Sequence, residues 1–157
     1  MGSTRVITMS KQVAIVDDNE GNRKLLLFAL RAGDYELHQA DTFAAAKELL
    51  GRDQLDLALF DVELPDGSGM ELAKTCRERF PQSTIIMLSA LDTNALYEKA
   101  LKSGANAYVI KPYNLRNVLA LIKQLEEQPV KPFEDMLMLP NNAPLSHYRP
   151  AARGGKA

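Results

Sequence analysis

Short apolar runs alternate with amphipathic segments along most of the chain. Residues 13–16 form an unbroken apolar run that ends in two aspartates, and residues 20–32 carry apolar side chains at helical spacing. An unbroken run of this length indicates a strand that is buried on both faces. The apolar runs recur at 57–60, 85–88 and 107–110, a further strand is expected at 35–39, and helices are expected at 42–50, 68–79, 92–103 and 114–125.

Five strands that alternate with five helices predict an α/β fold. Short connections between them favour a doubly wound parallel sheet with helices on both faces and right-handed crossovers. We expect residues 1–10 to form an N-terminal extension and residues 11–128 to form the domain. Residues 129–157 hold five of the eight prolines and lack sustained periodicity, which predicts a flexible Pro-rich tail or linker. Its one apolar stretch, Met136–Leu139, is expected to dock locally or lie loose.

Composition and charge narrow the class of protein. The 157 residues are 46% hydrophobic, which is an ordinary composition. Nineteen Lys and Arg are balanced by twenty Asp and Glu, so the chain lacks the excess positive charge that general nucleic-acid binding needs. We therefore expect protein partners and no direct DNA binding. A single cysteine, Cys76, and the lack of a signal-peptide pattern favour a reducing cytoplasm. No apolar run approaches the roughly 20 residues that a membrane span needs, so no membrane insertion is expected.

Polar residues follow four of the five predicted strands. These residues are Asp17 and Asp18, Asp61, Ser89 and Lys111. Any one of them alone is readily explained as a turn or cap residue. In an open parallel sheet, however, the carboxyl ends of the strands meet at the edge where ligands bind. Three carboxylates, a hydroxyl and an ammonium at that edge predict one shared site.

Three carboxylates at one edge need a positive partner. Two unit charges 4 Å apart repel by about 4 kcal/mol at an effective dielectric near 20. Lys111 is one partner, and a ligand set rich in oxygen and poor in His and Cys also suits Mg²⁺. Magnesium commonly accompanies phosphate chemistry, in which a carboxylate can attack a phosphoryl group and keep it as an aspartyl phosphate.

These motifs resemble the receiver domain of bacterial two-component response regulators over about residues 11–127. The matching positions are Asp17-Asp18, Asp61 with the following Leu64-Pro65-Asp66-Gly67-Ser68-Gly69, Ser89, and Lys111-Pro112. The resemblance implies a CheY-like, flavodoxin-like sheet with strand order 2-1-3-4-5. It also implies a phosphorylation-activated signalling switch that promotes its own phosphorylation and dephosphorylation and is not a metabolic enzyme.

The resemblance assigns a role to each site residue. Asp61 would accept the phosphoryl group from a sensor histidine kinase or a histidine phosphotransfer protein. Mg²⁺ would be held by Asp18 directly, by Asp17 mainly through water, by Asp61, and by the backbone carbonyl of Glu63. Lys111 would pair with a phosphoryl oxygen, and its bond to Pro112 would be cis.

The resemblance also implies how the signal leaves the domain. Ser89 would turn toward the phosphoryl group, and Tyr108 would follow it from an exposed to a buried position. The surface of the fourth helix, fifth strand and fifth helix would change and bind a downstream protein target, and relatives also form homodimers through this surface.

Other functions remain as alternatives. The chain can be a receiver cut from a longer regulator whose output domain is missing, with residues 129–157 as the start of a linker. It can also be a scaffold, or pseudo-receiver, that binds partners without phosphorylation. Two enzyme classes share the topology but fit poorly. A haloacid dehalogenase phosphatase needs Asp-x-Asp after the first strand, where this chain has Asp17-Asp18-Asn19, and a flavodoxin-like carrier needs a Ser/Thr/Gly-rich phosphate loop there.

Overall fold

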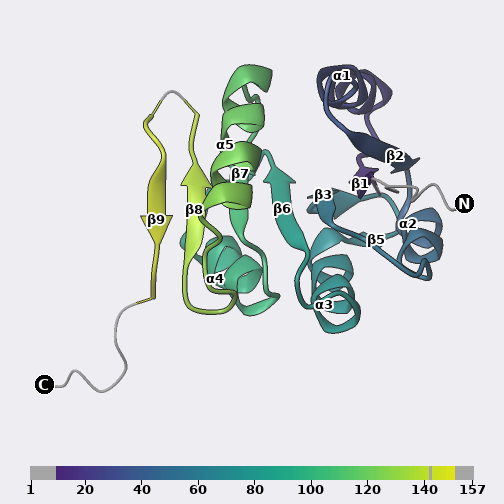
Figure 1. Cartoon of the computed structure of the whole chain (residues 1–157). Coiled ribbons are helices and arrows are strands. Elements are labelled where there is room, and N and C mark those ends of the chain that lie inside the picture. Colours follow the sequence, from purple (N-terminus) through teal and green to yellow (C-terminus); the bar gives the residue numbers. More distant parts are fainter. Residues whose placement is uncertain (1–9, 142, 151–157) are drawn as a thin grey trace, which may run out of the picture.

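The structure is a computed structural model that describes residues 10–141 and 143–150, and its centre is one sheet (Figure 1). The strands of this sheet are β1 Lys11–Val16, β2 Tyr35–Ala40, β3 Leu57–Asp61, β6 Thr84–Ser89, β7 Ala107–Ile110, β8 Met136–Leu139 and β9 Ser146–Tyr148. They lie in the order β2-β1-β3-β6-β7-β8-β9. All neighbours pair in parallel except β8 and β9, which are antiparallel. The predicted order of the first five strands is confirmed.

Five helices cover the two faces of the sheet, as the sequence predicts. They are α1 Glu20–Leu30, α2 Phe43–Leu49, α3 Gly69–Arg79, α4 Asn94–Lys102 and α5 Leu115–Glu127. A side chain just before each helix accepts a hydrogen bond from a main-chain N–H of the first turn, and these caps are Asn19, Thr42, Ser68, Thr93 and Asn114. Such caps satisfy donors that the helix cannot pair internally, so they define where each helix begins.

The sheet separates two apolar cores. Alternate residues of a strand point to opposite faces, so Val13 and Ile15 of β1 pack with α1 and α5, whereas Ala14 and Val16 pack with α2, α3 and α4. All four side chains are fully buried. This burial on both faces explains why β1, β3, β6 and β7 appear in the sequence as unbroken apolar runs.

The prediction of a flexible tail from residue 129 was wrong for β9 and for β8, where the structure shows the local docking of Met136–Leu139 that the sequence left open. The sheet does not end at β7, because β8 pairs with it and β9 pairs with β8 (Figure 1). Met136 and Met138 enter one core, and Leu137 and Leu139 enter the other. A four-residue apolar run among prolines gives no periodicity from which strand pairing could be predicted. In the structure, β8 pairs with the edge of β7, which would otherwise be exposed. Residues 151–157 of the predicted tail lie outside the described part, as do residues 1–9 of the predicted extension.

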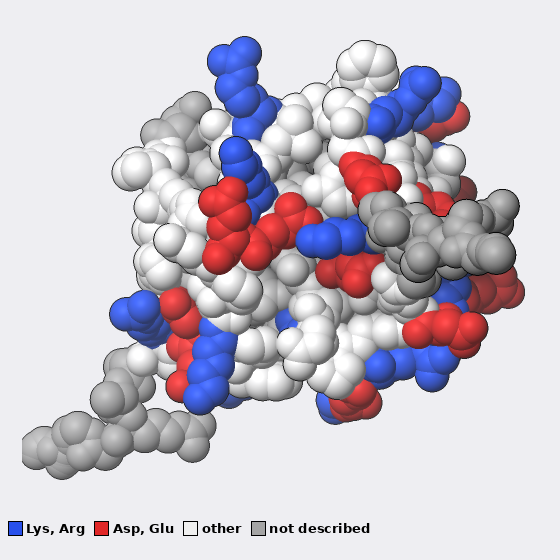
Figure 2. Space-filling model, viewed as in Figure 1, with Lys and Arg blue, Asp and Glu red and all other residues white. Residues whose placement is uncertain are grey.

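The charges on the surface are mixed. Figure 2 shows acidic and basic side chains interspersed over the face in view, consistent with the near-zero net charge. Within the described residues, the helices are all too short or too polar to span a lipid bilayer.

Candidate functional site

The carboxyl ends of two strands bring the predicted acidic residues together, and a third strand adds Lys111. Asp17 and Asp18 follow β1, and Asp61 is the last residue of β3. One carboxylate oxygen from each lies within 4.8 Å of the others. Lys111, which follows β7, places its Nζ 2.8 Å from Asp61 Oδ2 and 3.1 Å from Asp17 Oδ2.

Main-chain amides orient the two buried carboxylates. Asp17 is fully buried and its Oδ1 accepts a hydrogen bond from the N–H of Asn19, while Asp61 is 3% exposed and its Oδ1 accepts from the N–H of Glu63. Each residue therefore turns its second oxygen toward Lys111. Asp18 is exposed, so the cluster opens to solvent on its side.

Burial and charge act against each other at Asp61. Burial raises the pKa of the Asp61 carboxyl to about 6, and Asp17 acts in the same direction, whereas Lys111 and the Glu63 amide oppose the rise. Burial alone would lower the pKa of the Lys111 ammonium, but Asp61 and Asp17 outweigh it and the pKa is raised. The raised pKa of Asp61 and the raised pKa of Lys111 are compatible. Two carboxylates stabilise the single positive charge of Lys111, whereas Asp61 shares that one positive charge with Asp17.

The chemistry of these donors fits a hard divalent cation. Three carboxylates and a single ammonium leave a net negative charge at the site, and the carboxylate oxygens are the ligands that Mg²⁺ prefers. The exposed position of Asp18 leaves room for water, which Mg²⁺ usually keeps when it binds a protein.

Ser89 and Tyr108 lie beside this cluster and are connected through Leu91. Ser89 Oγ donates to the Glu63 carboxylate, at 2.9 Å from Oε2, and accepts from the N–H of Leu91 at 2.9 Å. The Tyr108 hydroxyl donates to the carbonyl of Leu91 at 2.7 Å. Tyr108 is fully buried. The structure thus places Tyr108 in the buried position that the resemblance assigns to the activated state.

Two residues contribute to the site in ways that the sequence did not reveal. Gly69 begins α3 so close to Asp61 that a Cβ there would overlap the Asp61 carbonyl oxygen. Tyr113 lies just after the Lys111–Pro112 bond, which is cis as the resemblance implied. Among the described residues, the buried Tyr113 hydroxyl has no hydrogen-bond partner, and burial and Asp17 raise its pKa to about 12. The sequence motif after Asp61 already contained Gly69, although not the reason why a glycine is needed there. Nothing in the sequence distinguished Tyr113 from an ordinary aromatic residue.

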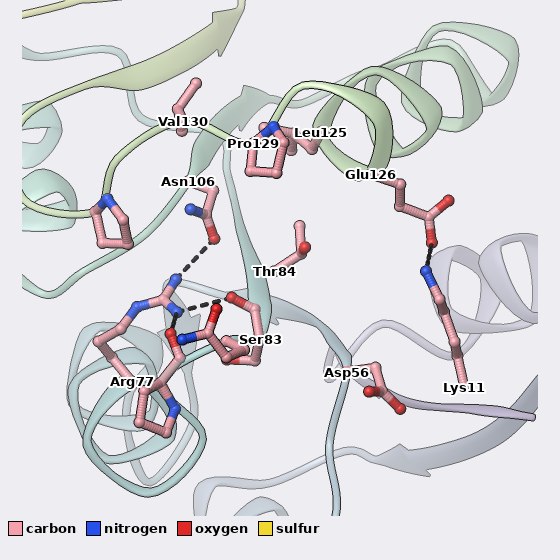
Figure 3. Close-up of a pocket in the computed structure, with 13 residues that line it drawn as sticks. Lys11, Asp56, Arg77, Ser83, Thr84, Asn106, Leu125, Glu126, Pro129 and Val130 are labelled. Carbon is pink, nitrogen blue, oxygen red and sulfur yellow. Dashed lines mark hydrogen bonds and ion pairs between the residues drawn. The ribbon is translucent and has the colours of Figure 1, made fainter. Parts of the chain in front are cut away.

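Two surface hollows differ in whether their polar side chains are free to bind a ligand. One, of about 250 Å³, lies beside Lys111 and is also lined by Leu25 of α1 and by Tyr113. The other, of similar size, lies at the opposite end of the sheet around the buried guanidinium of Arg77 (Figure 3). Arg77 donates to Asn106 Oδ1 and to the carbonyls of Pro81, Ser83 and Gly104. Every donor nitrogen of Arg77 therefore has a protein acceptor, and the second hollow is structural.

Comparison with known proteins identifies a family. Residues 13–123 match the response regulator receiver domain family. The chain is 36% identical over 131 residues to the response regulator protein PilR of Pseudomonas aeruginosa, covering 78% of this chain but only 29% of PilR. A CheY-like receiver domain protein of Methanospirillum hungatei is similar in structure, with a TM-score of 0.71, 32% identity, and coverage of 76% of this chain and 97% of that one.

A second similar structure has a modified aspartate. It is a response regulator of Burkholderia pseudomallei described with a phosphorylated aspartic acid, calcium ion and citrate. It matches with a TM-score of 0.66 and 27% identity, and the match covers 77% of this chain and 76% of that one.

Proposed function

Because this chain belongs to the response regulator receiver domain family, we propose that it accepts a phosphoryl group on Asp61 from a phosphohistidine of a sensor kinase or phosphotransfer protein. Asp61 Oδ would form a bond to phosphorus as the phosphorus–nitrogen bond of the donor breaks. The bonding electron pair returns to the imidazole nitrogen of the donor. The observation that carries the proposal is the pairing of Asp61 and Asp17 with one ammonium, that of Lys111.

The surroundings of Asp61 suit it to attack phosphorus. Its Oδ1 is held by the Glu63 amide, so its Oδ2 is the oxygen that lies beside Lys111. During transfer, negative charge would move from the Asp61 carboxylate onto the phosphoryl oxygens. The Lys111 ammonium already contacts Asp61 Oδ2, so it is placed to stabilise that charge on a neighbouring phosphoryl oxygen as well. The hollow next to Lys111 offers space from which a donor side chain can approach.

Mg²⁺ fits this site and would be held by Asp17, Asp18, Asp61 and the main-chain carbonyl of Glu63. When bound, the metal would neutralise charge on the transferring phosphoryl group. Asp17 is oriented by the Asn19 amide and by Lys111. That the similar Burkholderia response regulator is described with a phosphorylated aspartic acid supports a phosphoryl-accepting aspartate in this chain.

The output would pass through Ser89 to the surface formed by α4, β7 and α5. Ser89 Oγ is held by the Glu63 carboxylate and the Leu91 amide. A phosphoryl group on Asp61 adds strong acceptors, which would draw the Ser89 hydroxyl away from these partners. Because Leu91 also holds the Tyr108 hydroxyl, this movement would change the surroundings of Tyr108 and the binding surface for a downstream protein.

Intact-protein mass spectrometry tests the phosphorylation step. We expect the parent chain to gain one phosphoryl group from acetyl phosphate with Mg²⁺ and to remain unmodified when the metal is chelated. Asp61→Asn should gain none at that position, whereas Asp53→Asn, which changes an exposed aspartate in a loop, should react like the parent. An unmodified parent would favour the alternative of a scaffold that works without phosphorylation.

A further inference from the structure

The turn that carries the first two aspartates is connected to the start of α1 by hydrogen bonds. Asp17 Oδ1 accepts from the N–H of Asn19 at 2.9 Å. Asn19 in turn caps α1, because its side chain accepts from the N–H of Asn22 at 2.8 Å and its carbonyl accepts from the N–H of Arg23 at 3.0 Å. The position of the turn at Asp18 therefore depends on how the first turn of α1 is held.

The side chain of Arg23 reaches back from α1 to the end of β1. Its Nη1 donates to the main-chain carbonyl of Asp17 at 2.8 Å, and its Nε donates to Gln39 Oε1 at 2.8 Å. Gln39 lies near the end of β2, where the next residue, Ala40, accepts a hydrogen bond from the N–H of Asp17 at 3.2 Å. The end of β2 therefore supports Asp17 in two ways, directly through its N–H and indirectly through Arg23.

The geometry of these contacts suits a positioning role better than a role in charge pairing. Both acceptors of the Arg23 side chain are uncharged, one a carbonyl and the other a carboxamide oxygen. The guanidinium group is planar and rigid, so two hydrogen bonds from it fix the direction between Asp17 and Gln39. Asp17 is fully buried, so a lost donor would leave its carbonyl with an unfavourable environment unless the turn moved.

We propose that Arg23 is a positioning residue that holds Asp17 and Asp18 in the arrangement in which they and Asp61 bind Mg²⁺, and that Gln39 holds Arg23 in place. The inference rests on the Mg²⁺ site of the proposed function. The positive charge of Arg23 repels a cation, so on its own it would weaken Mg²⁺ binding. A favourable effect of Arg23 on Mg²⁺ affinity therefore has to come from the geometry of the turn, as for other residues that orient metal ligands.

Titration of the full chain with Mg²⁺, followed by amide NMR, measures the affinity and shows in the same spectra whether each variant is folded. We expect Arg23→Gln to bind Mg²⁺ about tenfold more weakly than the parent. Arg23→Lys can still donate one of the two hydrogen bonds and should recover part of this loss. Gln39→Met changes no charge and alters an exposed side chain, so it should fold normally and bind Mg²⁺ more weakly than the parent. The double substitution should bind no more weakly than Arg23→Gln alone, because Gln39 acts through Arg23.

A matched control separates position from charge. Lys24→Gln removes a positive charge from the next residue of α1, where the ammonium pairs with the exposed Glu20. We expect its affinity for Mg²⁺ to equal or slightly exceed that of the parent.

The possible results lead to different conclusions. Equal or tighter Mg²⁺ binding by Arg23→Gln would overturn the proposal, because Arg23 would then act through its charge or on folding alone. Parent-like binding by Gln39→Met would overturn the role of Gln39. A parent that binds no Mg²⁺ would refute the metal site and with it this role of Arg23. A parent that binds Mg²⁺ but gains no phosphoryl group from acetyl phosphate would refute only the proposed phosphorylation, and the order of the variants would still decide the role of Arg23.

Discussion

Replacing Asp61 by Asn should make the protein more stable at neutral pH. Asp61 is almost completely buried beside Asp17, and Lys111 is shared between them. Asn has nearly the shape of the protonated carboxyl group and can still accept a hydrogen bond from Lys111. The substitution therefore removes a buried charge without opening a cavity, so the folded state no longer carries the cost of keeping that charge out of water.

The size and the pH range of this effect follow from the pKa of Asp61. Its pKa rises from the ordinary 3.8 to about 6 in the folded protein. A difference of this size corresponds to about 3 kcal/mol. Between about pH 4 and pH 6 the folded state keeps a proton that the unfolded chain has lost, so the parent loses stability as the pH rises through this range. Asp61→Asn cannot lose that proton, so its advantage should be absent below about pH 4 and complete above about pH 7.

Urea unfolding at a series of pH values, with a chelator present to exclude divalent cations, measures the effect. We expect the free energy of unfolding of Asp61→Asn to exceed that of the parent by about 2–3 kcal/mol at pH 7.5, and the difference to shrink as the pH falls to 4.5. Asp53→Asn makes the same chemical change at an exposed position and should stay within about 0.5 kcal/mol of the parent. The reasoning is refuted if Asp61→Asn is less stable at pH 7.5, because the ion pair with Lys111 would then outweigh the burial.

Three further substitutions have defined outcomes. Gly69→Ala should cost about 1–3 kcal/mol in urea unfolding and slow phosphorylation by acetyl phosphate, because the new methyl group overlaps the Asp61 carbonyl oxygen. Arg77→Met should cost at least about 3 kcal/mol in the same assay, because it leaves buried acceptors without donors. Tyr113→Phe should raise stability by about 1 kcal/mol, because it removes a buried hydroxyl that is unpaired among the described residues, and should leave the phosphorylation rate unchanged.

Each of these outcomes can fail independently. Normal stability of Gly69→Ala would mean that α3 can shift away from Asp61 at little cost. A small effect of Arg77→Met would mean that water replaces the guanidinium in its hollow. Slower phosphorylation of Tyr113→Phe, measured by intact mass, would mean that this hydroxyl contacts the reacting groups.

The sequence alone determined the parts of the fold that depend on local pattern. The apolar runs in β1, β3, β6 and β7 are unbroken because both faces of these strands are buried, and each run stops next to a residue of the site. Asp17, Asp18, Asp61 and Lys111 could be expected at one edge, since parallel strands place their carboxyl ends together. Their convergence therefore required no knowledge of individual contacts.

Only the tertiary structure decided the features that depend on partners distant in the chain. Met136–Leu139 has the composition of a strand, but whether it pairs depends on the edge that β7 leaves open, which no local periodicity encodes. The sequence places Lys111 at the edge of the site, but only the structure shows that its Nζ bridges Asp17 and Asp61, at 3.1 and 2.8 Å. The rings of Tyr97, Tyr108 and Tyr148 meet only because the tertiary structure places α4 and the side chains of Tyr108 and Tyr148 on the same side of the sheet.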